Sequence, residues 1–437
     1  SIDCYVFHEC SSLTEIIIPS SVTSIGHNCF EKCSLITQII IPSKVTKIEK
    51  YTFANCTSLK RVEIPSSVNF IDEYAFYDCK SLIEIKIPES VTTIYDYTFF
   101  ACKSLIKVEM PKKLRSIKRA AFNGCSLLTN IPIPSTVTEI RELAFCSCFS
   151  LTEIKIPSKI NELQYSILSN CSSLTKLTIP SKTQVIGMDC FRNCSSITHF
   201  IIPSTVKSIK CGAFYGCSSL IEITIPSSVK SFEKYVFREC TSLIKVIFEN
   251  TSSMTSIEYQ TFQDCSSLPN LLIPSLVTSI KESAFDGCSL LTEISIPSSV
   301  KLIGTHAFSN CSSLTKIIFE NPSSVKSFGF CAFFRCSSLT EISIPSSVES
   351  IDDSAFENCT SLTKIIFENP SSIKSFGDSA FENCTSLTEI SFPSLVKSIG
   401  NSAFKNCTSL TVISIPSSFY LDKNKVCINS NANIIGF

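Results

Sequence analysis

A cysteine that recurs at a fixed interval constrains this chain more than any other feature. Eighteen of the 25 cysteines share one phase, and the step between neighbours is 23 residues in fourteen cases and 25 in three. These periodic cysteines are Cys10, Cys33, Cys56, Cys79, Cys102, Cys125, Cys148, Cys171, Cys194, Cys217, Cys240, Cys265, Cys288, Cys311, Cys336, Cys359, Cys384 and Cys407. A period of this length is typical of a repeat array, which grows in one dimension and needs no second core.

The first half of each unit has the pattern of a short strand. Counted from Cys336, the third, sixth and eighth residues are Leu339, Ile342 and Ile344, and Pro345 follows at the ninth position. The spacing of two predicts a strand that points these isoleucines inward, and proline ends it because it has no amide donor. Stacking would pair the strands of successive units in a parallel sheet.

The second half predicts another inward-facing segment and then a helix. The segment ends at Ile351, and the spacing of three from Phe356 to Cys359 suits one or two helical turns. Ser354 and Glu357 fit a capping box at the start of that helix. We therefore expect an α/β repeat in which the sheet lines a concave face, because the helix side of the unit needs more room.

The repeating unit LxxIxIPxxVxxIxxxAFxxC resembles the leucine-rich repeat of the BspA type, also called the Treponema pallidum class, found in surface proteins of bacteria and parasitic protists. The match covers roughly residues 1–418. The resemblance implies a curved leucine-rich-repeat solenoid and surface-associated adhesion or protein binding, and it supplies no catalytic residues.

The domain prediction follows from the extent of the repeats. We expect residues 1–418 to form a single solenoid of about 17 full repeats, followed by residues 419–437 as an irregular tail or cap. The first residues, SIDCYVF, match the second half of a repeat, so we expect the N-terminus to be truncated within a repeat.

Charge and hydropathy argue against two classes of partner. Lys plus Arg and Asp plus Glu each number 38, so the formal charge is zero and no one-signed field favours nucleic acid. No run of 18 apolar residues is present, so the sequence predicts no membrane-spanning segment.

The cysteines leave two structural interpretations open. In stacked units the periodic thiols would form a file in the core, where cysteine acts as a small hydrophobe. Structural disulfides remain the alternative, although such frameworks belong mostly to small secreted domains. A metal site is disfavoured because the periodic file lacks CxxC pairs and nearby histidines.

No arrangement of residues predicts catalysis. The four histidines are far apart in the sequence and lie in different phases of the repeat: His8, His27, His199 and His306. The phosphate-binding patterns GxxxxGK[ST] and GxGxxG are absent. We therefore predict that the chain is not an enzyme and has no catalytic residues, metal or cofactor.

The candidate binding site is an apolar patch on the concave side of the strands. The fourth, fifth and seventh residues after each cysteine should face solvent there, and contiguous exposed apolar side chains usually mark a partner. The candidate residues are Ile201, Ile221, Ile244, Ile247, Leu271, Leu272, Ile318 and Ile366, with 244–272 as the best stretch. Charge alternates in sign at the fifth position of successive repeats, and we interpret this as a cross-strand arrangement that fixes the register of the repeats. The residues are Glu293, Lys316, Glu341, Lys364 and Glu389.

Two further motifs carry alternatives. Three units replace IPSS by the longer segments 248–253, 319–324 and 367–372, which either mark a binding edge or record duplication of a neutral variant. NxS/T sites would be glycosylated only in a secretory compartment. They lie at Asn55, Asn170, Asn193, Asn250, Asn310, Asn358, Asn383 and Asn406.

The primary functional hypothesis is a non-enzymatic cell-surface or secreted protein that binds host or matrix proteins by its concave face. The alternative is an intracellular structural or scaffold repeat protein, consistent with many unpaired thiols. Recognition of glycan or peptide ligands is not separable from the first hypothesis, and the oligomeric state is left open.

Overall fold

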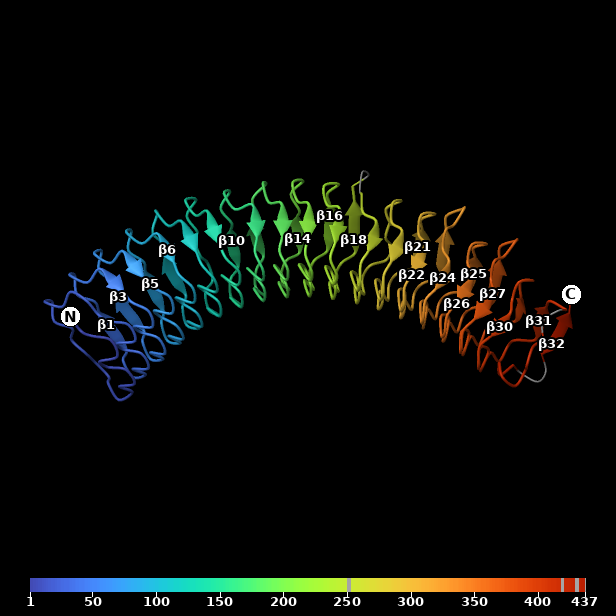
Figure 1. The fold of residues 1–437 in the computed structure, drawn as a ribbon, viewed down its shortest axis with the longest axis horizontal. Helices are drawn as coiled ribbons and strands as arrows, with labels where there is room; N and C mark the ends of the chain where they lie inside the picture. Colours follow the sequence, from blue (N-terminus) through green and yellow to red (C-terminus); the bar gives the residue numbers. More distant parts are fainter. Residues whose placement is uncertain (250–252, 418–419, 429–431, 437) are drawn as a thin grey trace. The chain divides into compact units, whose positions relative to one another are not determined.

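The computed structural model describes residues 1–249, 253–417, 420–428 and 432–436. The chain divides into two compact units, which we call unit 1 (Ser1–Val206 and Ala213–Ser218) and unit 2 (Lys207–Gly212 and Ser219–Phe437). Within each unit the chain winds in successive coils, one for each repeat (Figure 1). The predicted parallel-strand solenoid of stacked repeats is confirmed, whereas the single solenoid over residues 1–418 stays a prediction.

Each regular repeat contributes a first strand directly before its proline. In unit 1 these are β1 (Gln38–Ile40), β3 (Arg61–Glu63), β5 (Glu84–Lys86), β7 (Lys107–Glu109), β10 (Glu153–Lys155), β12 (Lys176–Thr178) and β14 (His199–Ile201). In unit 2 they are β16 (Glu222–Ile225), β18 (Lys245–Phe248), β21 (Glu293–Ile296), β23 (Lys316–Phe319), β25 (Glu341–Ile344), β27 (Lys364–Phe367), β29 (Glu389–Ser391) and β31 (Val412–Ile415). The tail adds β32 (Asn433–Gly436), which pairs with β31.

A second, two-residue strand follows the turn in each coil and ends on a buried residue, at the fifteenth position of the 23-residue repeats and the seventeenth of the 25-residue repeats. In unit 1 these are β2 (Lys47–Ile48), β4 (Phe70–Ile71), β6 (Thr93–Ile94), β8 (Ser116–Ile117), β9 (Glu139–Ile140), β11 (Glu162–Leu163) and β13 (Val185–Ile186). In unit 2 they are β15 (Ser208–Ile209), β17 (Ser231–Phe232), β19 (Ser256–Ile257), β20 (Ser279–Ile280), β22 (Leu302–Ile303), β24 (Ser327–Phe328), β26 (Ser350–Ile351), β28 (Ser375–Phe376) and β30 (Ser398–Ile399).

The strand pairs of the described chain are parallel and join equivalent residues of neighbouring repeats. Glu341 lies opposite Lys364 and Ile342 opposite Ile365, as the repeat predicts. The second strands from β19 to β30 form one continuous seven-stranded sheet in unit 2. The first strands form only short sheets of two or three, such as β21 with β23 and β25 with β27.

The predicted helices are absent from the described part of the chain, where turns occupy the AFxxC segment. Backbone amides there alternate between two kinds of acceptor. The Glu357 amide donates to the Ser354 carbonyl three residues earlier (3.1 Å), whereas the Phe356 amide donates to Ala380 of the next repeat (2.8 Å). Ser354 and Asn358 also have positive φ values of 55° and 62°. A helix needs negative φ and consecutive bonds within its own segment, so the α/β class with convex helices is not confirmed.

The core consists of columns that run from repeat to repeat. In unit 2 the rings of Phe262, Phe285, Phe308, Phe333, Phe356, Phe381 and Phe404 stack with centroids 5.1–5.5 Å apart. The periodic cysteines from Cys33 to Cys407 are buried beside these rings. The Cys359 thiol donates to the Phe333 carbonyl at 3.2 Å, and the same bond recurs along both units. The prediction of a buried thiol file is confirmed.

Repeats of 25 residues interrupt the first sheet of unit 2. Pairs β16–β18, β21–β23 and β25–β27 each match four residues against four, and the second strand of each pair precedes an insertion. No strand pairing continues from β18, β23 or β27 to the next described first strand. Residues 250–252 of the first insertion lie outside the described residues.

Candidate functional site

We call the solvent-facing side of the first strands the strand face. Burial alternates along each strand, so the fifth and seventh residues after the cysteine are exposed and the sixth is buried, as in β5. The strand face therefore consists of two side chains per repeat, supported by backbone pairing beneath. Whether it is concave stays a prediction.

The predicted apolar residues occupy very different environments. Ile201 in unit 1 is 86% exposed and Leu272 in unit 2 is 78% exposed, whereas Ile244 is 50% exposed. Ile247, Ile318 and Ile366 are between 36% and 39% exposed, and Ile221 is partly buried. Leu271 is only 5% exposed, which corrects its placement in the patch. It is the sixth residue after Cys265, and the two-residue period of a strand turns that position inward.

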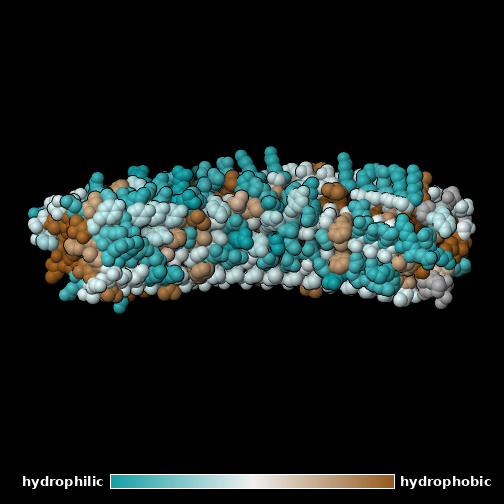
Figure 2. All heavy atoms as spheres, turned by 60° about the horizontal axis from the view of Figure 1, so that its bottom comes forward, coloured by the Kyte–Doolittle hydropathy of each residue, from teal (hydrophilic) through white to brown (hydrophobic). Residues whose placement is uncertain are grey.

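The apolar residues of unit 2 do not form an unbroken row. Ser295 lies opposite both Leu272 and Ile318 in the register, and Ser343 lies opposite Ile366. Small polar side chains thus separate most of the isoleucines. On the face that Figure 2 shows, apolar atoms gather in small separate areas within a mostly hydrophilic surface.

The sequence analysis missed an aromatic cluster in the turns of unit 1. Tyr51, Tyr74 and Tyr97 recur five residues before successive periodic cysteines, and their rings stack 4.6 and 4.8 Å apart. Tyr77 and Phe100 form a parallel pair 5.0 Å apart beside them. All five side chains are partly exposed. Their shared phase was visible in the sequence once residues were counted backward from each cysteine.

Cations flank this cluster at both ends. Lys50 Nζ lies 5.6 and 5.5 Å from the ring centres of Tyr51 and Tyr74, and the Arg119 guanidinium lies 5.9 Å from that of Tyr97. Lys50 is also paired with Glu73 at 2.8 Å. Cation–π contacts therefore hold the cluster in place, and the rings remain available only in part.

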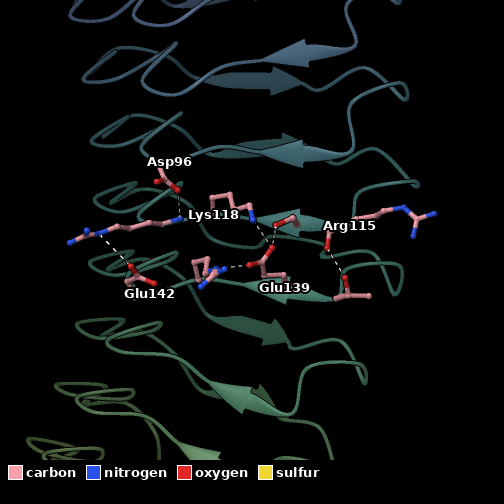
Figure 3. A network of polar contacts seen from close by, with 9 residues as sticks. Asp96, Arg115, Lys118, Glu139 and Glu142 are labelled. Carbon is pink, nitrogen blue, oxygen red and sulfur yellow. Dashed lines mark hydrogen bonds and ion pairs between the residues drawn. The ribbon is translucent and has the colours of Figure 1, made fainter.

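An ionic network lies along the second strands of unit 1 (Figure 3). Glu139 in β9 accepts hydrogen bonds from Lys118 Nζ at 2.6 Å and Ser116 Oγ at 2.7 Å, and from Arg141. These donors hold the pKa of Glu139 at about 2, with the Lys118 hydrogen bond as the largest cause. In Figure 3 the Arg115 side chain points away from the network. The network thus links adjacent repeats, and its charged and polar groups pair with one another.

Two grooves open on the strand face where the first sheet is interrupted. The groove of unit 1 has a volume of about 800 Å³ and lies around Pro132, between β7 and β10. The groove of unit 2 has a volume of about 750 Å³ and lies between β27 and β29. Both are open to solvent along the repeats.

Proline accompanies the interruption of the first sheet between β7 and β10, whereas the interruptions between β3 and β5 and between β12 and β14 occur without it. Where two first strands pair, the eighth residue donates its amide to the carbonyl of the seventh residue in the next repeat, as Ile87 does to Glu109 at 3.0 Å. Pro132 is itself a seventh residue and has no amide to return to the strand before it. Among the described residues, the amides of Met110 and Ile133 on either side have no backbone partner.

An insertion accompanies the interruption in unit 2. Glu368 of the FENPSS segment accepts a hydrogen bond from the Ser346 amide at 3.1 Å, which fixes the longer turn against the repeat before it. Phe367, Pro370, Phe392 and Leu395 give this groove an apolar lining. The equivalent glutamate of the second insertion, Glu320, makes the same bond to Ser298.

The grooves also differ in charge. Lys112, Lys155 and Lys176 line the groove of unit 1 together with a single carboxylate, Glu153. Within the described chain no salt bridge involves any of these three lysines. The groove of unit 2 contains one lysine, Lys364, and two carboxylates.

The thiols provide no reactive centre in the core. Burial raises the pKa of Cys359 to about 12 and that of Cys56 well above its ordinary value, so these groups are protonated near neutral pH. The structure shows no disulfide within the described residues. The described residues contain no cluster of histidine, cysteine or carboxylate side chains able to hold a metal ion. Catalysis is not tested by these observations, and its absence stays a prediction.

The asparagines of the NC[ST] motifs have a structural role in the turns. Asn383 has a φ of 59° and donates to Asn358 Oδ1 at 3.0 Å, and Asn406 donates to Asn383 at 2.8 Å. Asparagine tolerates this left-handed conformation better than most residues, which explains its recurrence before the cysteine. Asn250 lies outside the described residues.

Across the part of the chain that the structure describes, we find no helix with the length and hydrophobicity needed to span a lipid bilayer.

Comparison with solved structures identifies similar repeat proteins. A leucine-rich repeat protein from Bacteroides ovatus is 25% identical, with 92% of each chain covered and a TM-score of 0.55. A leucine rich cell surface protein from Faecalibacterium prausnitzii is 28% identical over 86% of this chain and 87% of the other, with a TM-score of 0.46. The leucine-rich repeat protein of T. pallidum is 26% identical, with 45% of this chain and 81% of the other covered and a TM-score of 0.32.

No curated protein matches the chain. The family model for BspA type leucine rich repeat regions matches residues 1–106, 92–221, 184–315 and 313–432. These ranges overlap and span nearly the whole sequence, in agreement with the repeat, the parallel strands and the Bacteroides fold. The chain therefore belongs to the BspA-type leucine-rich repeat family.

Proposed function

We propose that this chain is a non-enzymatic, adhesion-type surface protein that binds host or matrix proteins through its strand face. The observation that carries the proposal is the exposure of large aliphatic side chains on that face, with Ile17, Ile201 and Leu272 at 92%, 86% and 78%. Aliphatic side chains held in water on a rigid sheet gain free energy when a partner covers them. The surface location is supported by the family, whose repeats resemble those of bacterial and protist surface proteins.

The most useful stretch of the face is 244–272 in unit 2. Ile247 and Leu272 are seventh residues of consecutive repeats, and neither is paired with a charged residue at that position. Because the strand face has few aromatic anchors and serine separates most of its isoleucines, the proposal is weak contact repeated along the strands.

The test is a double substitution, Ile247→Glu with Leu272→Glu. Binding of the purified chain to surfaces coated with fibronectin, laminin or collagen, and to intact epithelial cells, would be compared with the parent chain. We expect at least a tenfold loss on every surface that the parent binds, with an unchanged circular dichroism spectrum. Leu276→Glu is the matched control, because Leu276 is 54% exposed in the same repeat but lies in the turn, off the strand face. Unchanged adhesion of the double variant would remove this face from the proposal.

A second candidate function, an intracellular structural or scaffold protein, is favoured by the thiols. The described residues show no disulfide, and reduced thiols are typical of the cytosol. Intact-mass analysis of protein from its native source, with and without glycosidase and reduction, separates the two functions. Glycans on the NC[ST] asparagines favour the surface function, and a bare chain with reduced thiols favours the scaffold.

A further inference from the structure

We propose that the groove of unit 1 binds an extended, acidic segment of a partner protein. This inference deepens the proposed protein-binding function and rests on it. The evidence is the combination of three lysines, backbone amides without a ladder partner and an apolar floor at the one repeat of unit 1 that has proline at the seventh position.

The charge of the groove defines the sign of its occupant. Lys112, Lys155 and Lys176 come from three different repeats and line one groove, with Glu153 as the single carboxylate of its lining. All three lysines are exposed, and none has a salt-bridge partner among the described residues. Other cations on the strand face of unit 1 do have such partners, as Arg61 has in Glu84 and Lys107 in Glu109, although Lys86 has none among the described residues. A carboxylate-bearing ligand would supply the missing counter-charge.

The backbone of the groove favours an extended ligand. Met110 and Ile133 lie at the eighth position, whose amide donates to the neighbouring first strand wherever the two strands pair, as Ile156 does to Thr178 at 2.9 Å. The ladder is interrupted at Pro132, and both amides lack that partner within the described residues, as do those of Ile64 and Ile179 at the other interruptions of unit 1. Carbonyl groups of a peptide in strand conformation are the natural acceptors for such donors.

The floor of the groove accepts alternate apolar side chains. Pro132 is exposed, and Met110, Ile133 and Pro134 are partly exposed around it. A peptide that alternates acidic and aliphatic residues places one set toward the floor and the other toward the lysines, because successive side chains of a strand point to opposite sides. We therefore expect a peptide that alternates acidic and aliphatic residues to bind this groove better than a run of acidic residues does.

The experiment uses the full chain and three labelled peptides in fluorescence anisotropy: acetyl-EVEIEVE-amide, its glutamine analogue QVQIQVQ, and the acidic run EEEEEEE. We expect the first to bind and the glutamine analogue to bind at least tenfold more weakly. Lys155→Gln and Lys176→Gln should each weaken binding about threefold and together about tenfold, as expected for exposed charge pairs. Lys316→Gln, at the same repeat position as Lys176 but in unit 2, is the matched control and should leave affinity unchanged.

A second variant tests the groove without removing charge. Pro132→Thr restores an amide at the seventh position, where Thr178 stands in another repeat, and leaves all three lysines in place. We expect peptide affinity to fall at least fivefold because the ladder closes. Equal binding by the parent and by the double lysine variant would overturn the inference, and so would equal affinity for single-stranded DNA or for phosphatidylserine vesicles.

The two proposals fail separately. Peptide binding that is lost in the lysine variants but kept in Ile247→Glu/Leu272→Glu supports the groove whatever happens to matrix adhesion. Matrix adhesion without any peptide binding overturns the groove and leaves the proposed function standing.

Discussion

The two grooves lie at the same point of the repeat but arise differently and have opposite character. In unit 1 a proline removes an amide from the ladder, and three lysines line the opening. In unit 2 a two-residue insertion precedes the opening, whose lining is largely apolar and carries one lysine against two glutamates. The buried columns of phenylalanine, leucine and cysteine run past both grooves, with Leu168 in the place of one phenylalanine beside the groove of unit 1. Interruption of the first sheet therefore changes the surface of the molecule, while the buried columns of the core continue.

The same contrast extends over the strand face. The seventh position carries Glu63, Lys86, Glu109 and Lys155 in unit 1, whereas in unit 2 it carries only serine, threonine or an aliphatic residue. Charge at the seventh position thus occurs in unit 1 only, whereas the fifth position carries charged residues in both units. Four experiments test this comparison.

The largest effect should come from the shared core. Phe122→Ala in unit 1 and Phe356→Ala in unit 2 each remove a fully buried ring, and each should lower the free energy of unfolding by about 3–5 kcal/mol. Urea denaturation followed by circular dichroism measures both. Phe330→Ala, at a ring that is 45% exposed, is the control and should cost less than about 1 kcal/mol. A large difference between the two buried sites would mean that the units do not share one core design.

Shortening the insertion should close the groove of unit 2. Replacing 367–372 by IPSS gives the repeat its 23-residue length, and we expect backbone bonds between β27 and β29, each worth about 1 kcal/mol. Hydrogen exchange at 389–392 should slow accordingly. Substituting Asn369 and Pro370 by glycine keeps the length and should leave the exchange at those amides fast. Fast exchange in the shortened chain would show that the insertion does not cause the interruption of the sheet.

Acid should weaken the ionic network of unit 1. The pKa of Glu139 is lowered from its ordinary 4.5 to about 2, so its ionised form stabilises the fold above pH 4.5 and this contribution disappears as the pH falls toward 2. Glu139→Gln should cost about 1 kcal/mol at pH 7 after allowance for solvent screening. The difference between the two chains should shrink to nearly nothing at pH 2. A difference independent of pH would assign the effect to packing.

The smallest effect should come from the register ladder. Glu84→Lys in unit 1 and Glu341→Lys in unit 2 each place like charges opposite one another, beside Lys107 and Lys364 respectively. Each should lower stability by about 0.3 kcal/mol at low salt. The loss at Glu84 should exceed that at Glu341, because Glu84 is also 3.8 Å from Arg61. Thermal denaturation at 20 mM and 500 mM salt measures the difference, and a loss that survives high salt would exclude a Coulombic origin.

The sequence predicted what repeats once per coil and failed where neighbouring coils interact. The strand before proline, the inward residues such as Ile342 and the thiol file follow from local spacing and were correct. The helix was wrong because the spacing of three from Phe356 to Cys359 also suits turns, and only the partner repeat reveals that alternate amides are shared. Leu271 was predicted to face solvent, but it lies one residue before the exposed seventh position and points inward. The grooves depend on which amides lack a neighbour, and a single repeat does not contain that information.

The four-residue pairing of β21 with β23 and of β25 with β27 has an evolutionary consequence. Two copies of this two-repeat module, equal in length and similar in sequence, follow each other, with 48 residues from Cys288 to Cys336 and 48 from Cys336 to Cys384. A recombination event that duplicates one module lengthens the gene while every new coil meets a neighbour like its old one. Each such event adds another interruption to the first sheet and none to the second. Array length and the number of potential grooves are therefore inherited together.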